Sequence, residues 1–373
     1  MPQERLRVGI DARAAAEVRG GRGVYVRELA RALAGLGDGV EPVLYGREPW
    51  SLPGTRFVQV GARDPIWPAR AGRLAARESD AVLAANSFLM AAAAGSASVA
   101  VVHDLFGFSR RFGAPAGALA ERATLPLAVR RAGGFICVSG ATRADLVRRY
   151  PSLESRSVAI PLGVSERFSG AVAGDAAARL GVTGEYVLAV GTREPRKNLG
   201  RLIRAFAELP TELRERFSLA VAGPPGWDDS EAHALASADA RVVMLGFVDD
   251  ADLPSLYAGA SVFAFPSLAE GFGLPVLEAM AAGTPVLTSD CSSLPEVAGD
   301  AALLVDPAAA GSIGAGLARL LGEPGLRSDL AARGRDRAAA FTWERTARAT
   351  LDYLTSVTST FDAGKSRARK VSS

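Results

Sequence analysis

The chain has 373 residues, of which 49% are hydrophobic and 22% charged. That length suffices for two domains with separate cores, and that balance excludes an intrinsically disordered or fibrous protein. The N-terminus, MPQERLRVGIDAR, lacks a long apolar region, so we expect no secretory signal and a cytoplasmic location. The longest apolar runs are Ala-rich and interrupted, so they predict no membrane span. Cys137 and Cys291 stand far apart without metal-ligand spacing, so we expect two free thiols in a reducing compartment.

Positive charge is concentrated in the first half of the chain. Residues 1–160 carry 22 arginines and no lysine against 14 acidic residues, whereas the remainder carries 21 basic and 26 acidic residues. A basic N-terminal half can face an anionic acceptor, or make a peripheral contact with the inner face of an anionic membrane. Arginines spread over solvated helix faces account for the same numbers. We expect no nucleic-acid partner.

Short apolar segments alternate with amphipathic helical patterns along most of the chain. In the first half the strand-like segments are 5–10, 40–46, 55–60, 80–85, 98–105 and 134–139. A connection over 157–168 leads to a second series at 186–191, 217–223, 241–247, 260–267, 284–290 and 301–307. Alternation of this kind predicts an α/β fold with parallel sheets.

The two series predict two Rossmann-like, doubly wound domains. We expect an N-terminal domain over 1–163 and a C-terminal domain over 164–340, facing each other across a cleft. Open α/β sheets bind ligands at the carboxyl ends of their strands, so the cleft is the expected site. We expect a helix over 341–360 that packs on one of the two domains, with the N-terminal domain as a candidate. The basic end, 361–373, is expected to be disordered.

The segment PSLAEGFGLPVLEAM is the most specific in the sequence. It places Glu270 before a glycine-rich turn and Glu278 on the helix that follows. Pro275 suits the first turn of that helix, and free amides at a helix start form an anion site. Those amides belong to Phe272, Gly273 and Leu274. A carboxylate so close to a phosphate site needs hydroxyl donors, so the pattern indicates a ligand that carries both phosphate and sugar or ribose groups.

Lysine occurs only at Lys197, Lys365 and Lys370, whereas arginine supplies the positive charge elsewhere. Lys197 stands where the segment GTREPRKNLGRL enters a helix. A cation there is unfavourable to the helix dipole unless an anion binds at the same place. Arg193 and Arg196 are close enough in sequence to join such an anion clamp, although each is equally typical of a solvated loop.

Two further positions at the start of the chain are candidates. His103 follows the strand-like run 98–102 and so stands at the carboxyl end of a strand, where α/β proteins build sites. A histidine of the core or the surface is the alternative. Gly21 and Gly23, in the run GGRG, open the first helix and can present amides to a phosphate or an acceptor, although GxGxxG is absent.

Together these segments resemble the family 4 glycosyltransferases, retaining enzymes of the GT-B fold, from about residue 6 to about residue 355. EGFGLPVLE is similar to that family's paired-glutamate motif, VGTREPRKNL to its diphosphate clamp and VVHDL to its active-site histidine segment. GGRGVYVRELARAL resembles its acceptor-side glycine loop. Many members carry arginine directly after the Gly of VG, where this chain has Thr192, so the clamp arginine stays open between Arg193 and Arg196.

The resemblance implies a retaining hexosyltransferase that needs neither cofactor nor metal. It would move a sugar from a nucleotide-diphosphate donor, either GDP-mannose or a deoxysugar nucleotide, to a sugar, lipid-linked or small-molecule acceptor. Glycan, glycolipid and natural-product biosynthesis all fit. It would have Glu270 bind the donor sugar and Glu278 the ribose. Catalytic roles would fall on His103, Lys197 and Glu270, and donor or acceptor binding on Gly21, Gly23, Arg193, Arg196, Lys197, Phe272, Gly273, Leu274 and Glu278.

Other functions fit the sequence less well. Asp250 and Asp252 match the DxD of metal-dependent sugar transferases, but they precede LPSLYAGA and are more typical of a helix N-cap region. A Rossmann oxidoreductase or epimerase needs GxGxxG and a Tyr-x-x-x-Lys pair, and both are absent. A periplasmic-type sugar-binding protein would need a signal peptide. A catalytically inactive scaffold that binds sugar nucleotides remains an alternative.

Overall fold

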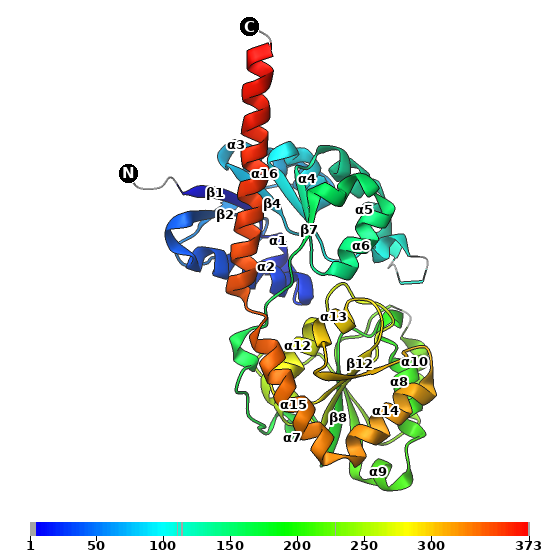
Figure 1. Ribbon diagram of the computed structural model, residues 1–373. Helices are drawn as coiled ribbons and strands as arrows, with labels where there is room; N and C mark the ends of the chain where they lie inside the picture. Colours follow the sequence, from blue (N-terminus) through cyan, green and yellow to red (C-terminus); the bar gives the residue numbers. More distant parts are fainter. Residues whose placement is uncertain (1–4, 110, 113–114, 228, 372–373) are drawn as a thin grey trace. The chain divides into compact units, whose positions relative to one another are not determined.

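The computed structural model describes residues 5–109, 111–112, 115–227 and 229–371. By their contacts, the residues divide into two compact units (Figure 1). Unit 1 combines Met1–Gly163 with Thr342–Ser373, and unit 2 is Val164–Phe341. The chain therefore passes between the units twice, after Gly163 and after Phe341.

Unit 1 is built on a sheet of seven parallel strands in the order β3-β2-β1-β4-β5-β6-β7. The strands are β1 (Leu6–Asp11), β2 (Val40–Gly46), β3 (Arg56–Gln59), β4 (Ala81–Ala84), β5 (Ser98–Val102), β6 (Gly134–Cys137) and β7 (Ser157–Ala159). Every residue of β4 and β5 is buried, as expected for a parallel sheet covered on both faces. β7 lies where the sequence indicated only a connection, because three residues are too few to show a strand pattern.

The helices of unit 1 follow the strands and cover the sheet. They are α1 (Arg13–Glu17), α2 (Gly21–Gly35), α3 (Ile66–Glu78), α4 (Phe88–Ala94), α5 (Pro115–Arg131), α6 (Gly140–Arg149) and α16 (Trp343–Val371). The core includes Trp67 of α3, whose side chain is fully buried. Its indole nitrogen donates a hydrogen bond to the Val60 carbonyl at 3.0 Å, so this large side chain is buried with its one polar atom satisfied.

Unit 2 is built on a sheet of six parallel strands in the order β10-β9-β8-β11-β12-β13. The strands are β8 (Glu185–Val190), β9 (Phe217–Ala222), β10 (Val242–Gly246), β11 (Val262–Phe265), β12 (Val286–Ser289) and β13 (Ala302–Val305). The helices are α7 (Ala176–Arg179), α8 (Leu199–Ala207), α9 (Thr211–Arg216), α10 (Ser230–Ser237), α11 (Leu253–Ala258), α12 (Leu274–Ala281), α13 (Leu294–Ala298), α14 (Ala310–Gly322) and α15 (Pro324–Ala339). The two sheets confirm the predicted α/β fold with two Rossmann-like units.

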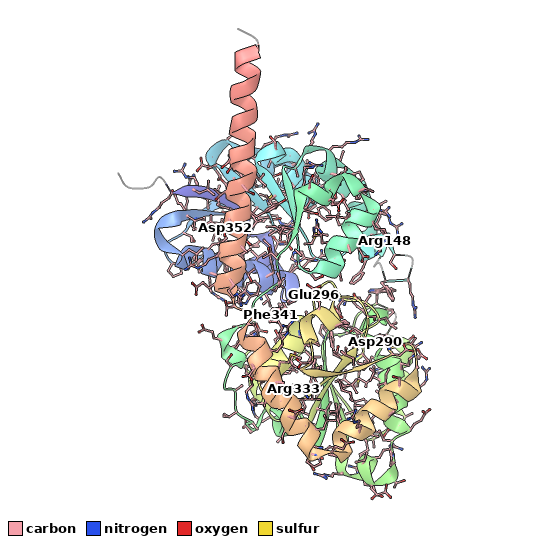
Figure 2. All side chains as sticks on the ribbon, viewed as in Figure 1. Arg148, Asp290, Glu296, Arg333, Phe341 and Asp352 are labelled. Atoms are coloured by element: carbon pink, nitrogen blue, oxygen red, sulfur yellow. The ribbon has the colours of Figure 1, made fainter. Side chains whose placement is uncertain are left out.

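The two ends of unit 2 are tied together at Phe341, which is labelled in Figure 2. Its carbonyl accepts a hydrogen bond from the amide of Val164 at 3.0 Å. Its ring also meets the ring of Phe272 edge-on, with 6.2 Å between the centroids. The segments that enter and leave unit 2 are thus linked to each other and to the loop before α12.

The long helix α16 packs on unit 1. The Trp343 ring lies 6.0 Å from the Tyr25 ring of α2. Further along the helix, Tyr353 donates a hydrogen bond to the Arg156 carbonyl at 2.7 Å. The helix continues to Val371, whereas the sequence suggested a helix ending near 360 and a disordered basic tail. The residues that extend it, FDAGKSRARKV, contain no proline and are mostly good helix formers, so the backbone meets no stop signal. Within the described ranges, no helix combines the length and apolarity needed to cross a membrane.

Each sheet reverses its strand order once. In unit 1 the reversal lies between β1 and β4, and in unit 2 it lies between β8 and β11. At such a point the loops that leave the two neighbouring strands diverge to opposite faces and leave a crevice at the carboxyl ends. The fold alone therefore directs attention to the segments that follow β1, β4, β8 and β11.

Gly21 and Gly23 lie in the first turn of α2 and not in a free loop. A Cβ atom at Gly23 would stand 1.7 Å from the Val18 carbonyl oxygen and 2.9 Å from that of Ala14, so the helix approaches this segment too closely for any side chain. A Cβ atom at Gly21 would meet nothing within 4 Å. Packing therefore accounts for Gly23 but not for Gly21.

The two glycines make a matched pair of variants. Gly23→Ala should lower the free energy of unfolding by about 1–3 kcal/mol, because the backbone atoms it meets cannot move aside cheaply. Gly21→Ala should leave the free energy within about 0.5 kcal/mol of wild type or raise it, since alanine favours helix. Urea unfolding followed by circular dichroism measures both. Equal free energies for the two variants would contradict the close packing described here.

Candidate functional site

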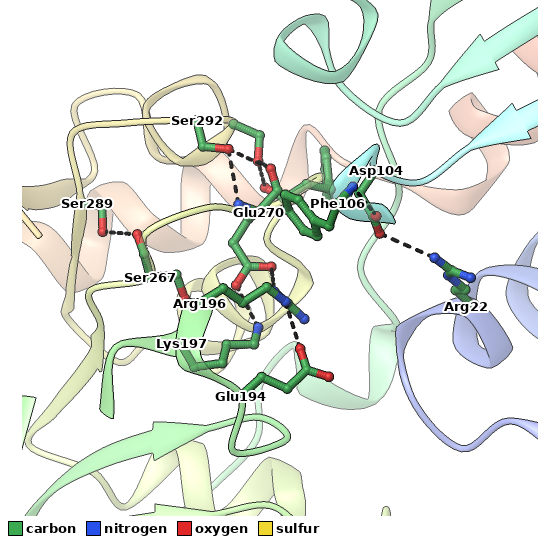
Figure 3. Close-up of polar contacts among 12 residues, drawn as sticks. Arg22, Asp104, Phe106, Glu194, Arg196, Lys197, Ser267, Glu270, Ser289 and Ser292 are labelled. Carbon is green, nitrogen blue, oxygen red and sulfur yellow. Dashed lines mark hydrogen bonds and ion pairs between the residues drawn. The ribbon is translucent and has the colours of Figure 1, made fainter. Parts of the chain in front are cut away.

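The loops that follow β8 and β11 bring Lys197 and Glu270 together (Figure 3). Lys197 ends a single 3-10 turn, Pro195–Lys197, and Glu270 lies five residues after β11. The two loops are joined by a hydrogen bond from the Leu268 amide to the Arg196 carbonyl at 2.7 Å. Residues 73 positions apart in the sequence thus meet at the reversal point of the unit 2 sheet.

Glu270 is shared between two cations. Its Oε1 lies 2.6 Å from the Nζ of Lys197, and its Oε2 lies 2.7 Å from an Nη of Arg196. The three side chains are 9%, 14% and 18% exposed, so the cluster is largely withdrawn from water. Arg196 also pairs with Glu194 at 2.8 Å, and Lys197 lies 4.4 Å from the centre of the Phe265 ring. The Lys197–Arg196–Glu270 group is therefore a buried ion cluster with its hydrogen bonds formed.

Burial dominates the protonation of Lys197. It lowers the pKa of this ammonium to about 8, although the carboxylate of Glu270 acts in the opposite direction. Burial alone would raise the pKa of Glu270, but Lys197 and Arg196 outweigh that effect and hold the pKa below its usual value. Glu270 is thus a carboxylate at neutral pH, and Lys197 is a cation that a further anion would stabilise.

The structure separates the two candidate arginines. Arg196 contacts Glu270, whereas Arg193 pairs with Asp229 at 2.9 Å and is 11% exposed. Arg193 also lies beside Pro225 in an isolated parallel bridge. Arg196 is therefore the arginine that stands with Lys197, while Arg193 links its loop to the loop after β9. Local spacing could not distinguish them, because both are within four residues of Lys197.

The turn between Glu270 and α12 is fixed by two serines. Ser292 accepts a hydrogen bond from the Glu270 amide at 3.0 Å and donates one to the Glu270 carbonyl at 2.7 Å. Ser293 donates to the Phe272 carbonyl at 2.7 Å. Gly273 has a φ of 117°, which a side chain would strain. The turn that precedes α12 is therefore held in one conformation.

Three amides of that turn have no hydrogen-bond partner among the described residues. They belong to Phe272, Gly273 and Leu274. Within the described part of the chain none of the three donates a hydrogen bond, and α12 has no side-chain cap. Pro275 lies in the first turn of α12, as the sequence predicted. This arrangement suits an anion, because unpaired amides and the helix dipole both favour negative charge.

Glu278 lies on α12 and is held by a tyrosine. The Tyr257 hydroxyl donates a hydrogen bond to Glu278 Oε2 at 2.9 Å. Burial raises the pKa of Glu278 above its usual value, while that hydroxyl acts to lower it. Tyr257 is itself fully buried between the rings of Phe168 and Phe263, at centroid distances of 5.6 and 5.3 Å. The hydrogen bond from Tyr257 thus orients the Glu278 carboxylate. Among the described residues no donor is assigned to its Oε1, which can accept from a ligand.

His103 lies directly after β5 in unit 1. Its Nε2 is 2.8 Å from the Ala85 carbonyl and therefore carries the proton, since a carbonyl can only accept. The ring meets Tyr25 edge-on at 4.9 Å. Burial, reinforced by the charge of Arg22, lowers the pKa of His103 to about 4. His103 is therefore neutral near pH 7, and its Nδ1 can accept a hydrogen bond.

Asp104, the residue after His103, forms an ion pair with Arg22 (Figure 3). An Nη of Arg22, in the first turn of α2, lies 3.4 Å from Asp104 Oδ2. The other carboxylate oxygen of Asp104 accepts a hydrogen bond from the Phe106 amide at 3.1 Å. The run GGRG therefore reaches the His103 segment through the arginine between its glycines, a contact that the sequence analysis did not predict.

The DxD match has a structural explanation. Asp252 precedes α11 but makes no side-chain cap, and it pairs with Arg179 at 2.7 Å. Asp250 pairs with Arg167 at 3.7 Å. The expected N-cap position is thus correct for Asp252, although its carboxylate binds an arginine and not the helix amides. Among the residues that the structure describes, no cluster of three or more His, Cys, Asp or Glu side chains could hold a metal ion.

Sequence reasoning missed several residues that position the site. Asn198 is buried, and its amide nitrogen donates to the carbonyls of Pro266 and Pro307 at 2.9 and 2.7 Å. It thereby fixes the residue next to Lys197 to segments 68 and 109 positions away. Its φ of 62° marks a left-handed residue, and asparagine adopts this conformation more readily than most. Ser292, Ser293 and Tyr257 lie in no sequence pattern that would have predicted their contacts with the site.

The protonation of Lys197 can be measured directly, because the chain has only three lysines. With lysine labelled at Cε, one resonance should titrate with a midpoint of about 8 and vanish in Lys197→Arg. Glu270→Gln should lower that midpoint by roughly one unit or more, since it removes the carboxylate that favours the charged form. Glu208→Gln, on the exposed end of α8, is the control and should not shift it. A midpoint that rose or stayed constant in Glu270→Gln would contradict the described pairing.

Comparisons with known proteins bear on both units. The family model "Glycosyltransferase Family 4" matches residues 19–168, and the model "Glycosyl transferases group 1" matches residues 176–337. An O-antigen chain mannosyltransferase B of Escherichia coli is 38% identical over 228 residues, which are 58% of this chain and 59% of the relative. The chain thus spans about three-fifths of that relative, and under a third of the longer E. coli mannosyltransferases that it also matches.

Two further similarities extend over nearly the whole chain. An MMP α-(1→4)-mannosyltransferase of Mycolicibacterium hassiacum is 29% identical over 89% of this chain and 93% of the relative. The crystal structure of HepE from Anabaena, in complex with UDP and glucose, superposes with a TM-score of 0.76 at 18% identity, over 94% of this chain and all of that chain. The latter likeness shows the GT-B fold. With the two family models matched in succession along the chain, this protein belongs to the group 1 glycosyl transferases of glycosyltransferase family 4.

Proposed function

We propose that the protein is a retaining glycosyltransferase that transfers a sugar from a nucleoside-diphosphate donor bound on unit 2. The observation that carries this proposal is the Lys197–Arg196–Glu270 cluster beside the unpaired amides of residues 272–274. Cations and amides together suit a diphosphate, and a buried carboxylate between them suits the hydroxyls of a sugar. An isolated phosphate site would not need Glu270, and an isolated sugar site would not need Lys197.

Donor binding would change the partners within the cluster. Phosphate oxygens would take the place of Glu270 around Lys197 and Arg196, and the freed oxygens of Glu270 would accept hydrogen bonds from hydroxyls of the donor sugar. Glu278 would accept from the ribose through its open Oε1. The lowered pKa of Lys197 supports this exchange, because a buried ammonium gains more from a doubly charged diphosphate than from one shared carboxylate.

The reaction proposed is a substitution at the anomeric carbon. The bond from that carbon to the diphosphate oxygen breaks, and a bond to an acceptor hydroxyl oxygen forms on the same face. The hydroxyl proton passes to the leaving diphosphate, so that no base on the protein is needed. Lys197, Arg196 and the amides of residues 272–274 stabilise the charge that develops on the leaving group. The neutral His103 of unit 1 can accept a hydrogen bond from a hydroxyl but cannot supply positive charge.

For the donor we propose GDP-mannose, with a deoxysugar nucleotide as the alternative. The relatives that match this chain in E. coli and M. hassiacum are named mannosyltransferases, which supports a mannosyl donor. The HepE structure holds UDP and glucose, so the fold also accommodates a uridine nucleotide. A panel of nucleoside diphosphates in a thermal-shift assay ranks the bases, because the tightest ligand raises the melting temperature most.

Substitutions of the two glutamates should change different kinetic constants. Glu270→Gln should lower kcat, because its contact to the reacting sugar changes as the anomeric carbon becomes positive. Glu278→Gln should raise the donor KM with little change in kcat, because the ribose is remote from the breaking bond.

Lys197→Ala should lower turnover by on the order of 100-fold. Steady-state kinetics with the donor from the panel measures all three, with Glu208→Gln as the control.

Two outcomes would count against these assignments. If Glu270→Gln lost only donor affinity and Glu278→Gln only kcat, the two roles would be reversed. If Lys197→Ala turned over like wild type, the cluster would not serve the leaving group. Binding of a sugar nucleotide with no transfer or hydrolysis by the wild-type protein would favour a scaffold in place of an enzyme.

We propose that no metal takes part, because Lys197 and Arg196 can supply the positive charge that an ion would provide. Turnover should therefore be unchanged, within about twofold, in a large excess of EDTA. The same assay after dialysis against EDTA, with and without added Mn²⁺ or Mg²⁺, checks this expectation. Loss of activity on chelation and its recovery with either ion would refute the metal-free mechanism.

A further inference from the structure

Unit 1 has a cavity of its own at the reversal point of its sheet. It measures about 400 Å³, which is within the range of small-molecule sites. Its lining comes from the segments after β1 and β4, from the end of β5 and the residues that follow it, from the start of α3, and from α2, α4 and α5. Its polar side chains include Arg13, Arg22, Asn86, His103, Asp104 and Glu121. The position of this cavity is the one that the strand order predicts for a ligand site.

The cations of this cavity are already neutralised. Arg13 lies 2.9 Å from Asp64, and Arg22 lies 3.4 Å from Asp104, and both acids also line the cavity. His103 is neutral near pH 7. Of the described residues that line the cavity, no other is basic. An anionic ligand would therefore meet carboxylates without an unpaired cation to offset them.

Two side chains in the cavity have polar atoms without a hydrogen-bond partner. Both polar atoms of the Asn86 amide, and Oε1 of Glu121, are buried without a hydrogen bond to any residue that the structure describes. Each such group costs about 1–3 kcal/mol when left unpaired. Asn86 lies two residues after β4, and its backbone amide donates to Asp11 Oδ2 at 3.3 Å, so the backbone at this residue is fixed. These atoms form a preset group of one donor and two acceptors.

Sugar hydroxyls match this group. A hydroxyl both donates and accepts, so neighbouring hydroxyls can satisfy the Asn86 amide in both senses and donate to Glu121 and to Nδ1 of His103. Burial, together with the charge of Asp104, raises the pKa of Glu121 to about 7. This carboxyl group can therefore bind a hydroxyl either as an acceptor or, when protonated, as a donor. A phosphate or carboxylate has no donors for Asn86 Oδ1.

We propose that this cavity binds an uncharged, polyhydroxylated acceptor, a sugar without phosphate or carboxylate groups, through Asn86 and Glu121. The assignment rests on the proposed glycosyl transfer, because it names the class of molecule that receives the sugar. It does not depend on the donor site, since every residue that carries it belongs to unit 1. Asn86 and Glu121 are thus the acceptor-binding residues, and the Arg22–Asp104 pair excludes anions.

The test uses the full chain and matched probes. Saturation-transfer NMR compares methyl α-mannoside with mannose 6-phosphate, and methyl α-glucoside with glucose 6-phosphate. The neutral member of at least one pair should bind, and its phosphorylated counterpart should bind at least tenfold more weakly. Asn86→Leu and Glu121→Gln should each weaken the neutral probe by about tenfold, which equals about 1.4 kcal/mol. Thr350→Val, which removes another buried and unpartnered hydroxyl of unit 1 outside the cavity, is the control and should bind like wild type.

A variant of Asp104 tests whether the Arg22–Asp104 pair excludes anions. Asp104→Asn keeps an acceptor for the Phe106 amide but leaves Arg22 without its carboxylate, so it should increase binding of the phosphorylated probes. The proposal is overturned if wild type prefers the phosphorylated probes, if none of the neutral probes binds, or if Asn86→Leu binds them unchanged. Hydrolysis of the donor in the absence of an acceptor distinguishes a failure of this proposal from a failure of the proposed function. Its absence in wild type would refute the transferase but not the probe binding, and hydrolysis should stay unchanged in the control variant Thr350→Val.

Discussion

The reversal of strand order in each sheet decides where distant segments of this chain meet. In a parallel sheet, neighbouring strands normally send their following loops to the same side, and those loops cover the carboxyl edge. Where the order reverses, the loops diverge and the edge stays open. Between β8 and β11 this brings Lys197 beside Glu270, and between β1 and β4 it leaves the cavity around Asn86. Neither constellation could form from segments that are adjacent in the sequence.

The two open edges differ in how their charges are balanced. In unit 2, the Glu270 carboxylate pairs with two cations that could instead pair with a phosphate. Three backbone amides close to it in sequence have no hydrogen-bond partner among the described residues. In unit 1, the Arg22–Asp104 pair is closed on itself, and the unpaired atoms belong to an amide and one carboxyl oxygen. The first pattern suits a charged diphosphate, while the second suits neutral hydroxyls. A transferase that joins an activated sugar to an uncharged one needs this difference.

The unit 2 site depends on supporting residues that need not touch a ligand. Ser292 and Ser293 fix the turn after Glu270, Asn198 fixes the loop of Lys197, and Tyr257 fixes Glu278. Holding these groups in place before a ligand arrives reduces the conformational entropy that binding must overcome. Membership in glycosyltransferase family 4 is consistent with such a preformed donor site, and the mannosyltransferases among the relatives give the donor proposal its direction.

The sequence alone determined the local features of this protein. Apolar segments at the strand positions predicted twelve of the strands, and the turn EGFGLPVLE predicted the start of α12. Only the tertiary structure decided between Arg193 and Arg196, because the choice depends on which arginine a carboxylate 74 positions away can reach. It also decided that Gly23 packs against Val18, and that the Asn86 amide is buried without a partner. Spacing along a chain fixes which neighbours share a helix face or a turn, whereas contacts across a sheet depend on strand order, which no local pattern encodes.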